Sequence, residues 1–340
     1  MNIKWYISDL HACGHVRGEI IAREVNNRRK HRIDLKTNFT YSDMLGDVGV
    51  FLFQRHHTPD ILERMRFASS RGIATFYELD DDLFHIPPDF EKAFGFYSDP
   101  RIQFVLKQFV ADADVVTCTS AILAEAVYAL RRPKTVLILD NLIDYDMWQL
   151  APRDKVEGEI RIVWMASASH KMDAPIVESA LLRLMKERPQ VKLLLIGWIA
   201  DQEFPWIKDF PGRVICLPWV DIVDLPGVMA GADIGIAPLK TNAFNAAKSN
   251  LKVLQYGALG AVPVVSSIDA YRRAISNGHD GVIIDDDGDW FDALKELIDN
   301  DVRRKEMSAM IRTKIEGAYN VKNGVVIWES AFEAFGGKRS

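Results

Sequence analysis

The residues best suited to hold a phosphate lie together in the second half of the chain. Lys248, Ser249 and Asn250 stand where the periodicity predicts the start of a helix over Ser249–Leu259. The N-terminus of a helix presents free backbone N–H groups, and an adjacent ammonium, hydroxyl and amide add further donors for an anion. Such a site suits a diphosphate whose negative charge grows as it leaves. The pattern therefore predicts a pyrophosphate site. The alternative interpretation is an ordinary capped helix with solvated lysines.

The first half of the chain offers further candidates near the ends of predicted strands. Gly14, between the first strand and the first helix, allows the backbone to approach a phosphate closely, and Arg17 is a candidate phosphate clamp. Asp80, Asp81 and Asp82 end another strand and carry the oxygen ligands that Mg²⁺ prefers. Adjacent residues of a strand point to opposite faces, so the three carboxylates cannot converge on one ion without a bend. The preferred interpretation is therefore that Asp81 or Asp82 forms hydrogen bonds with hydroxyl groups of a ligand.

The elements that must position these residues alternate regularly. Short apolar runs are separated by amphipathic segments of helix length, which indicates parallel sheets built from βαβ units. In the first half the predicted strands are Ile3–Ser8, Val48–Phe53, Ile73–Leu79, Asp114–Cys118 and Thr135–Leu139. The predicted helices between them are Gly18–Asn27, Pro59–Ser70, Pro100–Ala111 and Ser120–Leu130.

The same pattern restarts after a polar segment, Leu150–Gly158, which contains a proline and a glycine and is interpreted as a linker. The strands predicted beyond it are Ile160–Met165, Val191–Gly197, Arg213–Leu217, Ile234–Pro238, Val262–Ser266 and Val282–Ile284. Besides the helix at Ser249, helices are predicted near Asp173–Arg188, Val223–Ala230, Ala270–Ser276, Trp290–Ile298, Val302–Gly317 and Asn323–Phe335. Two doubly wound sheets in tandem would direct the carboxyl ends of both sets of strands toward one interdomain cleft, where ligands bind in such folds.

Composition excludes several other classes of protein. A net charge of −5 gives no global attraction to nucleic acid or to an anionic membrane. The basic run Arg28–Arg32 is a local exception, interpreted here as a solvated helix end. No apolar run approaches the roughly 20 residues of a membrane span, and no signal peptide is recognisable. Three widely spaced cysteines argue for a reducing compartment, so the expected location is cytoplasmic.

Longer stretches of the sequence resemble a known family. Lys248-Ser249-Asn250-Leu251-Lys252-Val253-Leu254-Gln255-Tyr256-Gly257-Ala258 resembles the donor-binding segment of retaining GT-B glycosyltransferases of the bacterial and phage type, which reads Lys-Ser-x-x-Lys-x-Leu-Glu-Tyr-Gly-Ala. Phe76–Phe84 is similar to the aspartate strand of the family's N-terminal domain, and Asn141–Asp144 matches its Asn-x-x-Asp. Trp164–His170 and Asp173 resemble the first strand and loop of its nucleotide-binding domain.

The resemblance implies an α/β GT-B fold with two Rossmann-like domains facing a cleft. Residues 1–152 would form the acceptor-side domain and residues 159–320 the domain that binds the nucleotide sugar, with a final helix in 321–340 that could cross back to the first domain. The expected activity is transfer of a sugar, with retention, from a nucleotide-diphosphate sugar, most simply a UDP-sugar. Neither a metal nor a cofactor is expected, and the leaving diphosphate would take the proton of the acceptor hydroxyl.

The resemblance also assigns roles to single residues. Lys248 would neutralise the diphosphate, Ser249 and Asn250 would donate hydrogen bonds to it, and His170 with Lys171 would replace a basic pair. Gln255 stands where the family has a glutamate that holds the ribose, and Ala247 where it has another acidic residue. The remaining assignments are Trp219 and Val220 at the nucleobase, with core packing as the alternative, and Asp81 or Asp82 at the acceptor hydroxyls.

Three readings of the function stay open at this stage. The acceptor of a transferase could be a glycan, a protein or modified nucleic acid. A nucleotide-sugar epimerase of the same fold would need no separate acceptor. The departures at Ala247 and Gln255 also allow a non-catalytic protein that binds a nucleotide sugar.

Overall fold

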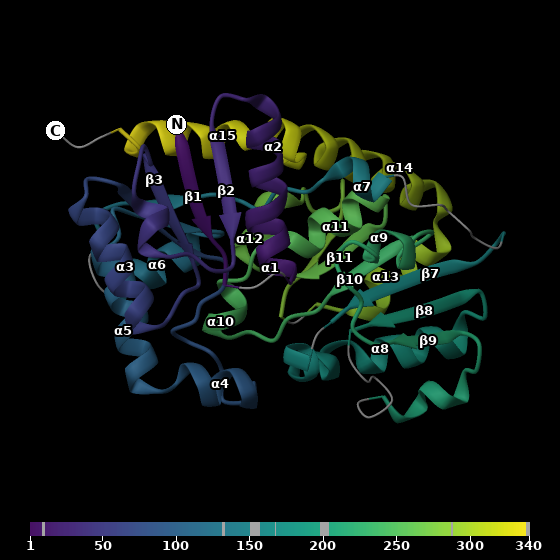
Figure 1. Cartoon of the computed structure of the whole chain (residues 1–340). Helices are drawn as coiled ribbons and strands as arrows, with labels where there is room; N and C mark the ends of the chain where they lie inside the picture. Colours follow the sequence, from purple (N-terminus) through teal and green to yellow (C-terminus); the bar gives the residue numbers. More distant parts are fainter. Residues whose placement is uncertain are drawn as a thin grey trace. The chain divides into compact units, whose positions relative to one another are not determined.

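The computed structural model describes residues 1–8, 11–130, 133–149, 157–166, 168–197, 204–286 and 288–337. The chain divides into two compact units (Figure 1). Unit 1 comprises Met1–Ile143, Ala246–Ser249 and Asn320–Ser340, and unit 2 comprises Asp144–Asn245 and Asn250–Tyr319. The second unit thus begins at Asp144, whereas the sequence predicted the boundary near residue 152. Most of the predicted linker, residues 150–156, lies outside the described residues.

Unit 1 is built on a six-stranded sheet whose strands all pair in parallel. The strand order is β2-β1-β3-β4-β5-β6. The strands are β1 (Asn2–Tyr6), β2 (Arg32–Lys36), β3 (Val50–Gln54), β4 (Ala74–Leu79), β5 (Val115–Cys118) and β6 (Val136–Ile138). The sequence did not predict β2, because this edge strand alternates polar and apolar residues and buries only Ile33 fully. The order reverses between β1 and β3, and such switch points are where ligands bind at the carboxyl ends of strands.

Helices cover both faces of this sheet. They are α1 (Ala12–Gly14), α2 (Ile20–Arg28), α3 (Pro59–Ser70), α4 (Glu91–Tyr97), α5 (Pro100–Asp112), α6 (Ala121–Leu130) and α15 (Val321–Phe335). Short α4 was not predicted, and it has no buried residue to reveal it. The final helix, α15, packs in unit 1: the ring of Trp328 lies 5.0 Å from that of Trp5 on β1. Figure 1 shows α2 and α15 close together near β1.

Unit 2 contains a second parallel sheet of six strands, in the order β12-β11-β10-β7-β8-β9. The strands are β7 (Ile160–Met165), β8 (Val191–Ile196), β9 (Val214–Leu217), β10 (Ile234–Ala237), β11 (Val262–Ser266) and β12 (Val282–Ile284). Numbered along the chain, this is the 3-2-1-4-5-6 order of nucleotide-binding sheets, with its switch point between β7 and β10. All six strands were predicted, because each contributes an apolar run.

The helices of unit 2 follow the predicted alternation, with some differences in length. They are α7 (Tyr145–Gln149), α8 (Ala174–Glu187), α9 (Leu225–Val228), α10 (Ala243–Ala246), α11 (Leu251–Leu259), α12 (Asp269–Ala274), α13 (Trp290–Asp299) and α14 (Asp301–Lys314). Helix α9 is a single turn, Leu225–Val228, and is shorter than predicted. Pro226 lies in its first turn, where proline is tolerated, and Gly227 lowers the helix propensity of the segment. Residues Ala168–Asp173, after β7, form a 3₁₀ turn.

Tyr256 fixes helix α11 onto the sheet. Its hydroxyl donates to the carbonyl of Ile236 on β10 at 2.9 Å and accepts from the backbone N–H of Met165 on β7 at 3.3 Å. A Cβ at Gly235 would collide with the ring of Tyr256, so only glycine lets the ring lie against β10. On the opposite side Gly257 lets α14 approach, since a Cβ there would lie 2.7 Å from Ile311. The amino end of α11 is therefore held beside the switch point of β7 and β10.

Candidate active site

Three side chains meet at the switch point of unit 2. His170, in the turn after β7, places its Nδ1 2.7 Å from Oδ2 of Asp173. Its Nε2 lies 2.8 Å from Nζ of Lys252, in the first turn of α11. His170 is only 5% exposed and Asp173 only 1%. The turn after β7 and the first turn of α11 thus bring a lysine, a histidine and an aspartate into one hydrogen-bonded cluster.

Asp173 fixes the tautomer of His170. The other oxygen of Asp173 accepts from the backbone N–H of Lys240 at 2.7 Å and from Nδ2 of Asn245 at 3.2 Å. A carboxylate with these donors accepts the Nδ1–H of His170, which leaves Nε2 as the acceptor for the Lys252 ammonium. Because both ring nitrogens of His170 are engaged, it does not offer a charged N–H to a ligand as the sequence suggested. Lys252 carries the positive charge of the cluster instead.

The amino end of α11 has buried amides beside the lysine. Asn250 is the N-cap, yet its side chain makes no capping hydrogen bond. Its Oδ1, and the Oε1 of Gln255, are buried without a hydrogen-bond partner among the residues described. A buried acceptor without a partner is costly, so both oxygens are suited to a ligand that brings hydrogen-bond donors.

Lys248 and Ser249 belong to unit 1, and both are half-buried. The Oγ of Ser249 accepts from Nδ2 of Asn141 at 2.8 Å. Ala247 is fully buried in the apolar core of unit 1, and its carbonyl accepts from Oγ of Ser120 at 2.7 Å. An acidic side chain at position 247 would therefore be buried among the apolar side chains of unit 1.

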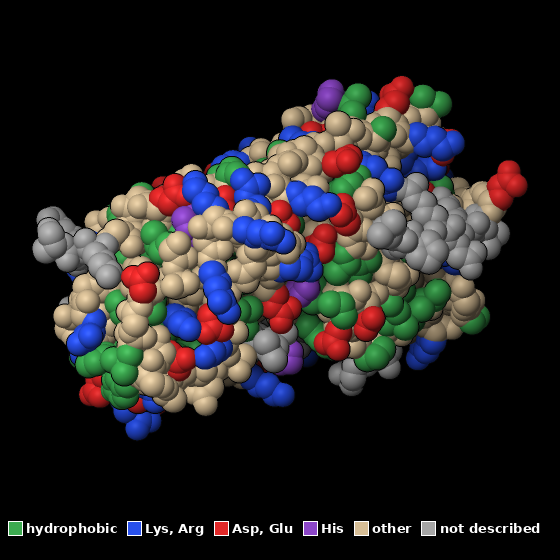
Figure 2. Space-filling model, turned by 45° about the horizontal axis from the view of Figure 1, so that its top comes forward, with side chains coloured by type: hydrophobic (Ala, Val, Ile, Leu, Met, Phe, Trp, Pro, Cys, Tyr) green, Lys and Arg blue, Asp and Glu red, His purple; other side chains and the backbone are tan. Residues whose placement is uncertain are grey.

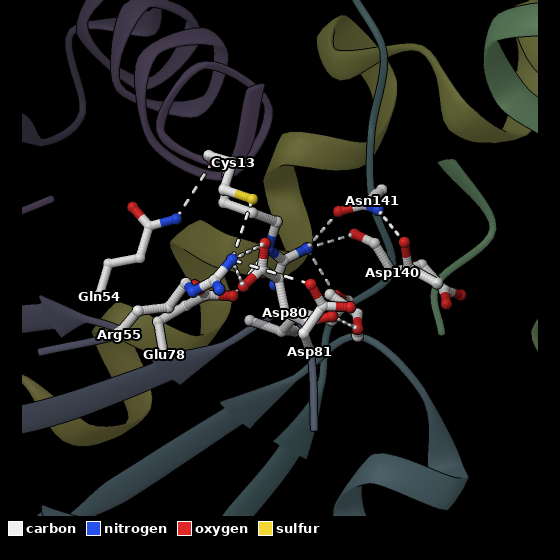
Figure 3. A network of polar contacts seen from close by, with 12 residues as sticks. Cys13, Gln54, Arg55, Glu78, Asp80, Asp81, Asp140 and Asn141 are labelled. Carbon is white, nitrogen blue, oxygen red and sulfur yellow. Dashed lines mark hydrogen bonds and ion pairs between the residues drawn. The ribbon is translucent and has the colours of Figure 1, made fainter. Parts of the chain in front are cut away.

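Arg17, the candidate phosphate clamp of the sequence, is a buried ion-pair partner of Glu78. Its Nε donates to Oε1 of Glu78 at 2.8 Å, and Nη1 donates to the carbonyl of Leu139 at 2.8 Å and to Oδ1 of Asn141 at 3.2 Å. The guanidinium also lies 5.0 Å from the ring of Trp328. Nη1 also donates to the carbonyl of Asp140 at 3.2 Å. Figure 3 labels three of the partners of Arg17: Glu78, Asp140 and Asn141.

Gly14 does not use the freedom of a glycine backbone. It is buried, with φ −62° and ψ −40° as in a right-handed helix. Gly18 is the glycine that the fold needs in this region, because a Cβ there would lie 2.9 Å from Ile7. Residue type alone does not distinguish the two glycines.

The three aspartates after β4 diverge. Asp80 lies 3.1 Å from the guanidinium of Arg55, and Asp81 lies 3.8 Å from it (Figure 3). Asp82 turns the other way, accepting from the backbone N–H of Phe84 at 3.0 Å and lying 2.8 Å from His85. No group of three or more His, Cys, Asp or Glu in the described part of the chain could hold a metal ion. Of the two predicted acceptor ligands, Asp81 is the more exposed.

Arg55 is a further candidate site residue that the sequence did not reveal. It follows β3 at the switch point of unit 1 and has φ +54°, a left-handed conformation that is uncommon outside glycine. Its Nη1 also donates to Sγ of Cys13 at 3.1 Å, and Nε2 of Gln54 donates to the carbonyl of Cys13 at 3.1 Å. Strained residues held by such contacts are common at functional sites.

Trp219 and Val220 follow the edge strand β9. Trp219 is 57% exposed, so packing in the core does not explain this residue. Val220 is half-buried. An exposed indole beside the carboxyl end of a strand is free to stack on a flat ligand.

The basic run Arg28–Arg32 lies at the other end of the unit 1 sheet. Arg32 begins β2, so the run is at the amino ends of the strands, away from the edge where ligands bind. Arg28 pairs with Glu329, and Lys30 and His31 pair with Glu333. Figure 2 likewise shows acidic side chains interleaved with lysines and arginines on the face in view.

Glu78 should make folding stability depend on pH. Burial raises the pKa of Glu78 from 4.5 to about 7, against the lowering effect of Arg17. The folded protein then holds a proton that the unfolded chain has lost, so stability falls as pH rises from 4.5 to 7. We expect the free energy of unfolding of the wild type to fall between pH 5 and pH 8, and this fall to be absent in Glu78→Gln.

Urea unfolding of both proteins at several pH values measures this difference. Burial lowers the pKa of His56 to about 3, which makes stability fall as pH drops below 6.5. His56 is common to both proteins, so subtracting the two profiles removes its contribution. Parallel profiles would show that Glu78 is ionised throughout.

Comparison with known proteins identifies what unit 2 resembles. Residues 160–300 match the family model of the glycosyl transferases group 1. Over 164 residues the chain is 29% identical to a D-inositol 3-phosphate glycosyltransferase of Paenarthrobacter aurescens (strain TC1), an alignment that covers 45% of this chain and 39% of that protein. The chain therefore spans about two fifths of the length of this curated relative.

Solved structures match the chain over nearly its whole length. Anabaena HepE in complex with UDP and glucose has a TM-score of 0.72 and 14% identity, with 98% of this chain and 100% of that chain covered. Sucrose-phosphate synthase from Thermosynechococcus elongatus gives 0.68 and 10%, and a glycosyltransferase from Rickettsia africae ESF-5 gives 0.67 and 13%, each with 98% of both chains covered. At these identities the likeness concerns the fold. It confirms the predicted α/β class, with two parallel six-stranded sheets of the GT-B kind.

Among the helices that the structure describes, none combines the length and the hydrophobicity needed to cross a lipid bilayer.

Proposed function

We propose that this protein is a retaining glycosyltransferase that moves a sugar from a nucleoside-diphosphate sugar, most simply a UDP-sugar, to an acceptor hydroxyl. The observation that carries the proposal is the cluster of Lys252, His170 and Asp173 beside the amino end of α11, at the switch point of a nucleotide-binding sheet. The match of residues 160–300 to the group 1 glycosyltransferases supports it. So does the fold shared with a protein whose structure contains UDP and glucose.

The diphosphate is bound by the first turn of α11 in this proposal. The first four N–H groups of a helix have no partner within it, and they carry partial positive charge. Lys252 adds a full charge, and its hydrogen bond to His170 holds the ammonium in place. Lys248, Lys171 and the Ser249 hydroxyl are the further donors that we assign to the phosphates. His170 and Asp173 act as positioning residues for Lys252.

The remaining contacts to the two substrates are assigned to buried amide oxygens, an exposed indole and a carboxylate. Gln255, with its buried Oε1 lacking a partner among the residues described, accepts from a ribose hydroxyl as the family's glutamate would. Asn250 offers a second such oxygen. Trp219, with Val220 beside it, stacks on the nucleobase. In unit 1, Asp81 accepts from the acceptor hydroxyl, with Arg55 holding its carboxylate.

The chemistry requires no side-chain nucleophile. As the bond between the sugar C1 and the diphosphate oxygen breaks, charge grows on the diphosphate, and fixed donors at α11 stabilise it. The acceptor hydroxyl attacks from the same face and gives its proton to the departing phosphate. Positive charge from Lys252 and the helix takes the part that a metal ion has in other transferases, so we propose a metal-independent reaction.

A donor-only assay tests this function without knowledge of the acceptor. Water replaces the acceptor slowly, so UDP-glucose and other nucleotide sugars in the presence of EDTA should release nucleoside diphosphate and a sugar of the donor's anomeric configuration. Early NMR spectra of the released sugar measure the anomer. Release of the inverted anomer, or dependence on added Mg²⁺, would overturn the corresponding part of the proposal.

One observation favours a second candidate, a protein that binds nucleotide sugars without turnover. Ala247, where the family has an acidic residue, is sealed in the core of unit 1. Under this alternative the same assay shows tight binding of a donor with no release of nucleoside diphosphate. Measurable release favours the transferase.

A further inference from the structure

A chain of buried hydrogen bonds in unit 1 leads to Ser249. Glu78 accepts from Arg17 Nε at 2.8 Å, and Arg17 Nη1 donates to Asn141 Oδ1 at 3.2 Å. Nδ2 of the same amide then donates to Ser249 Oγ at 2.8 Å. Glu78, Arg17 and Asn141 are at most 3% exposed. Figure 3 shows the Asn141 amide with a contact on each side.

The direction of this chain is forced by Arg17. A guanidinium has five N–H donors and no acceptor. Arg17 can therefore form a hydrogen bond only with the oxygen of the Asn141 amide, and not with its NH₂ group. The reversed amide would place an NH₂ group against the guanidinium, with two donors facing each other. Arg17 itself is fixed, because Nη1 also donates to the carbonyls of Leu139 and Asp140 at 2.8 and 3.2 Å. The NH₂ of Asn141 must therefore face Ser249.

This orientation decides what the Ser249 hydroxyl can do. A hydroxyl has one proton and two acceptor lone pairs. Since Asn141 donates to it, its oxygen acts as acceptor on that side, and its own proton is left to donate elsewhere. If the oxygen of Asn141 faced it instead, the Ser249 hydroxyl would donate its hydrogen bond to that oxygen. Only its acceptor lone pairs would then be available to a phosphate.

The segment that carries Ser249 is also held in place independently. Two residues earlier, the carbonyl of Ala247 accepts from Ser120 Oγ at 2.7 Å. Ser120 Oγ in turn accepts from the backbone N–H of Leu123 in the first turn of α6 at 3.1 Å, so both functions of this hydroxyl are used. Ser120 fixes the backbone and Asn141 fixes the hydroxyl.

We propose that Arg17 and Asn141 are positioning residues that keep the Ser249 hydroxyl a hydrogen-bond donor toward the diphosphate of the donor substrate. This inference rests on the proposed function, because it assigns the anion that receives the proton. Glu78 balances the charge of Arg17, and the amide of Asn141 transmits the orientation. Arg17 thus serves the donor site through Asn141, without a contact of its own.

Asn141→Asp is the decisive variant. The aspartate carboxylate has nearly the same shape as the amide and still accepts a hydrogen bond from Arg17. It has no donor, so the Ser249 hydroxyl would donate its hydrogen bond to the carboxylate instead of to the diphosphate. The dissociation constant for UDP, measured by calorimetry, should rise roughly 10- to 100-fold, the usual size of a lost hydrogen bond to a charged group. Ser249→Ala should raise it by a similar factor.

The double variant separates orientation from the added negative charge. In the Ser249→Ala background the hydroxyl is gone, so Asn141→Asp should weaken UDP binding by less than about 2-fold. If Asn141→Asp weakens UDP binding as much there as in the wild type, charge repulsion or misfolding explains its effect. The proposed relay, in which Arg17 and Asn141 orient the Ser249 hydroxyl, is then refuted. Equal UDP affinity of wild type and Asn141→Asp also refutes it.

Failure of the relay is distinguishable from failure of the proposed function. If wild-type protein binds neither UDP nor any nucleotide sugar, the function is overturned and the relay with it. If it binds UDP and Ser249→Ala has no effect, the function stands and the relay fails. Urea unfolding of Ser249→Ala, a mild change at a half-buried position, confirms that the fold is intact in this arm.

Discussion

Replacement of Lys252 by methionine is expected to lower the rate of sugar transfer or donor hydrolysis about 100- to 1,000-fold, the typical effect of removing one group that stabilises charge in a transition state. Methionine keeps the length of the side chain and removes the ammonium that His170 holds at 2.8 Å. The charge of the leaving diphosphate would then be stabilised by the helix N-terminus and the other candidate lysines alone. Initial rates of nucleoside diphosphate release measure the effect.

Lys305→Met is the matched control. Lys305 lies on α14 and its side chain is 77% exposed, with an ion pair to Asp301 at 2.7 Å. An exposed ion pair contributes little, so its loss should leave the rate unchanged. The rates of Lys248→Met and Lys171→Met show how much the two other candidate lysines contribute. A Lys252→Met enzyme as fast as the Lys305→Met control would remove Lys252 from the reaction.

Ala247→Glu, which restores the family's acidic residue, is expected to destabilise the protein by about 3 kcal/mol or more rather than to improve it. The side chain of Ala247 has no exposed surface and lies in the apolar core of unit 1. A larger side chain there overpacks the core, and its carboxylate would be buried without a partner. The free energy of unfolding in urea measures the loss.

Ala309→Glu serves as the control, because Ala309 is exposed on α14 and a surface substitution usually changes stability by less than about 0.5 kcal/mol. An Ala247→Glu protein as stable as this control would mean that position 247 opens to solvent. The packing of the segment would then not explain why this chain has alanine instead of an acidic residue at position 247.

The sequence predicted the sheets well because most strands are buried and therefore apolar. Strands β7, β11 and β12 have the predicted bounds. β2 was missed because an edge strand may alternate polar and apolar residues without forming a buried run. Helix α4 was missed because it buries nothing. The start of α11 was predicted from its N-cap types, and Asn250 is the cap.

The site was predicted less completely, because its contacts join distant parts of the chain. His170 and Lys252 are 82 positions apart, so nothing in the sequence shows that the histidine is an acceptor for the lysine. Arg17 has the residue type of a phosphate clamp, and only its partner Glu78, 61 positions away, shows that it is an internal ion pair. Asp173, three positions after His170, was the one partner that local spacing could have revealed.

The central claim is that the amino end of α11, with Lys252, binds the diphosphate of a nucleotide sugar. Calorimetric titration of wild type, Lys252→Met and Lys305→Met with UDP and a panel of nucleotide sugars tests it most directly. We predict that the wild type and Lys305→Met bind at least one of these ligands equally well and that Lys252→Met binds it at least about 10-fold more weakly. Equal affinity of all three proteins, or no binding of any nucleoside diphosphate, would contradict the claim.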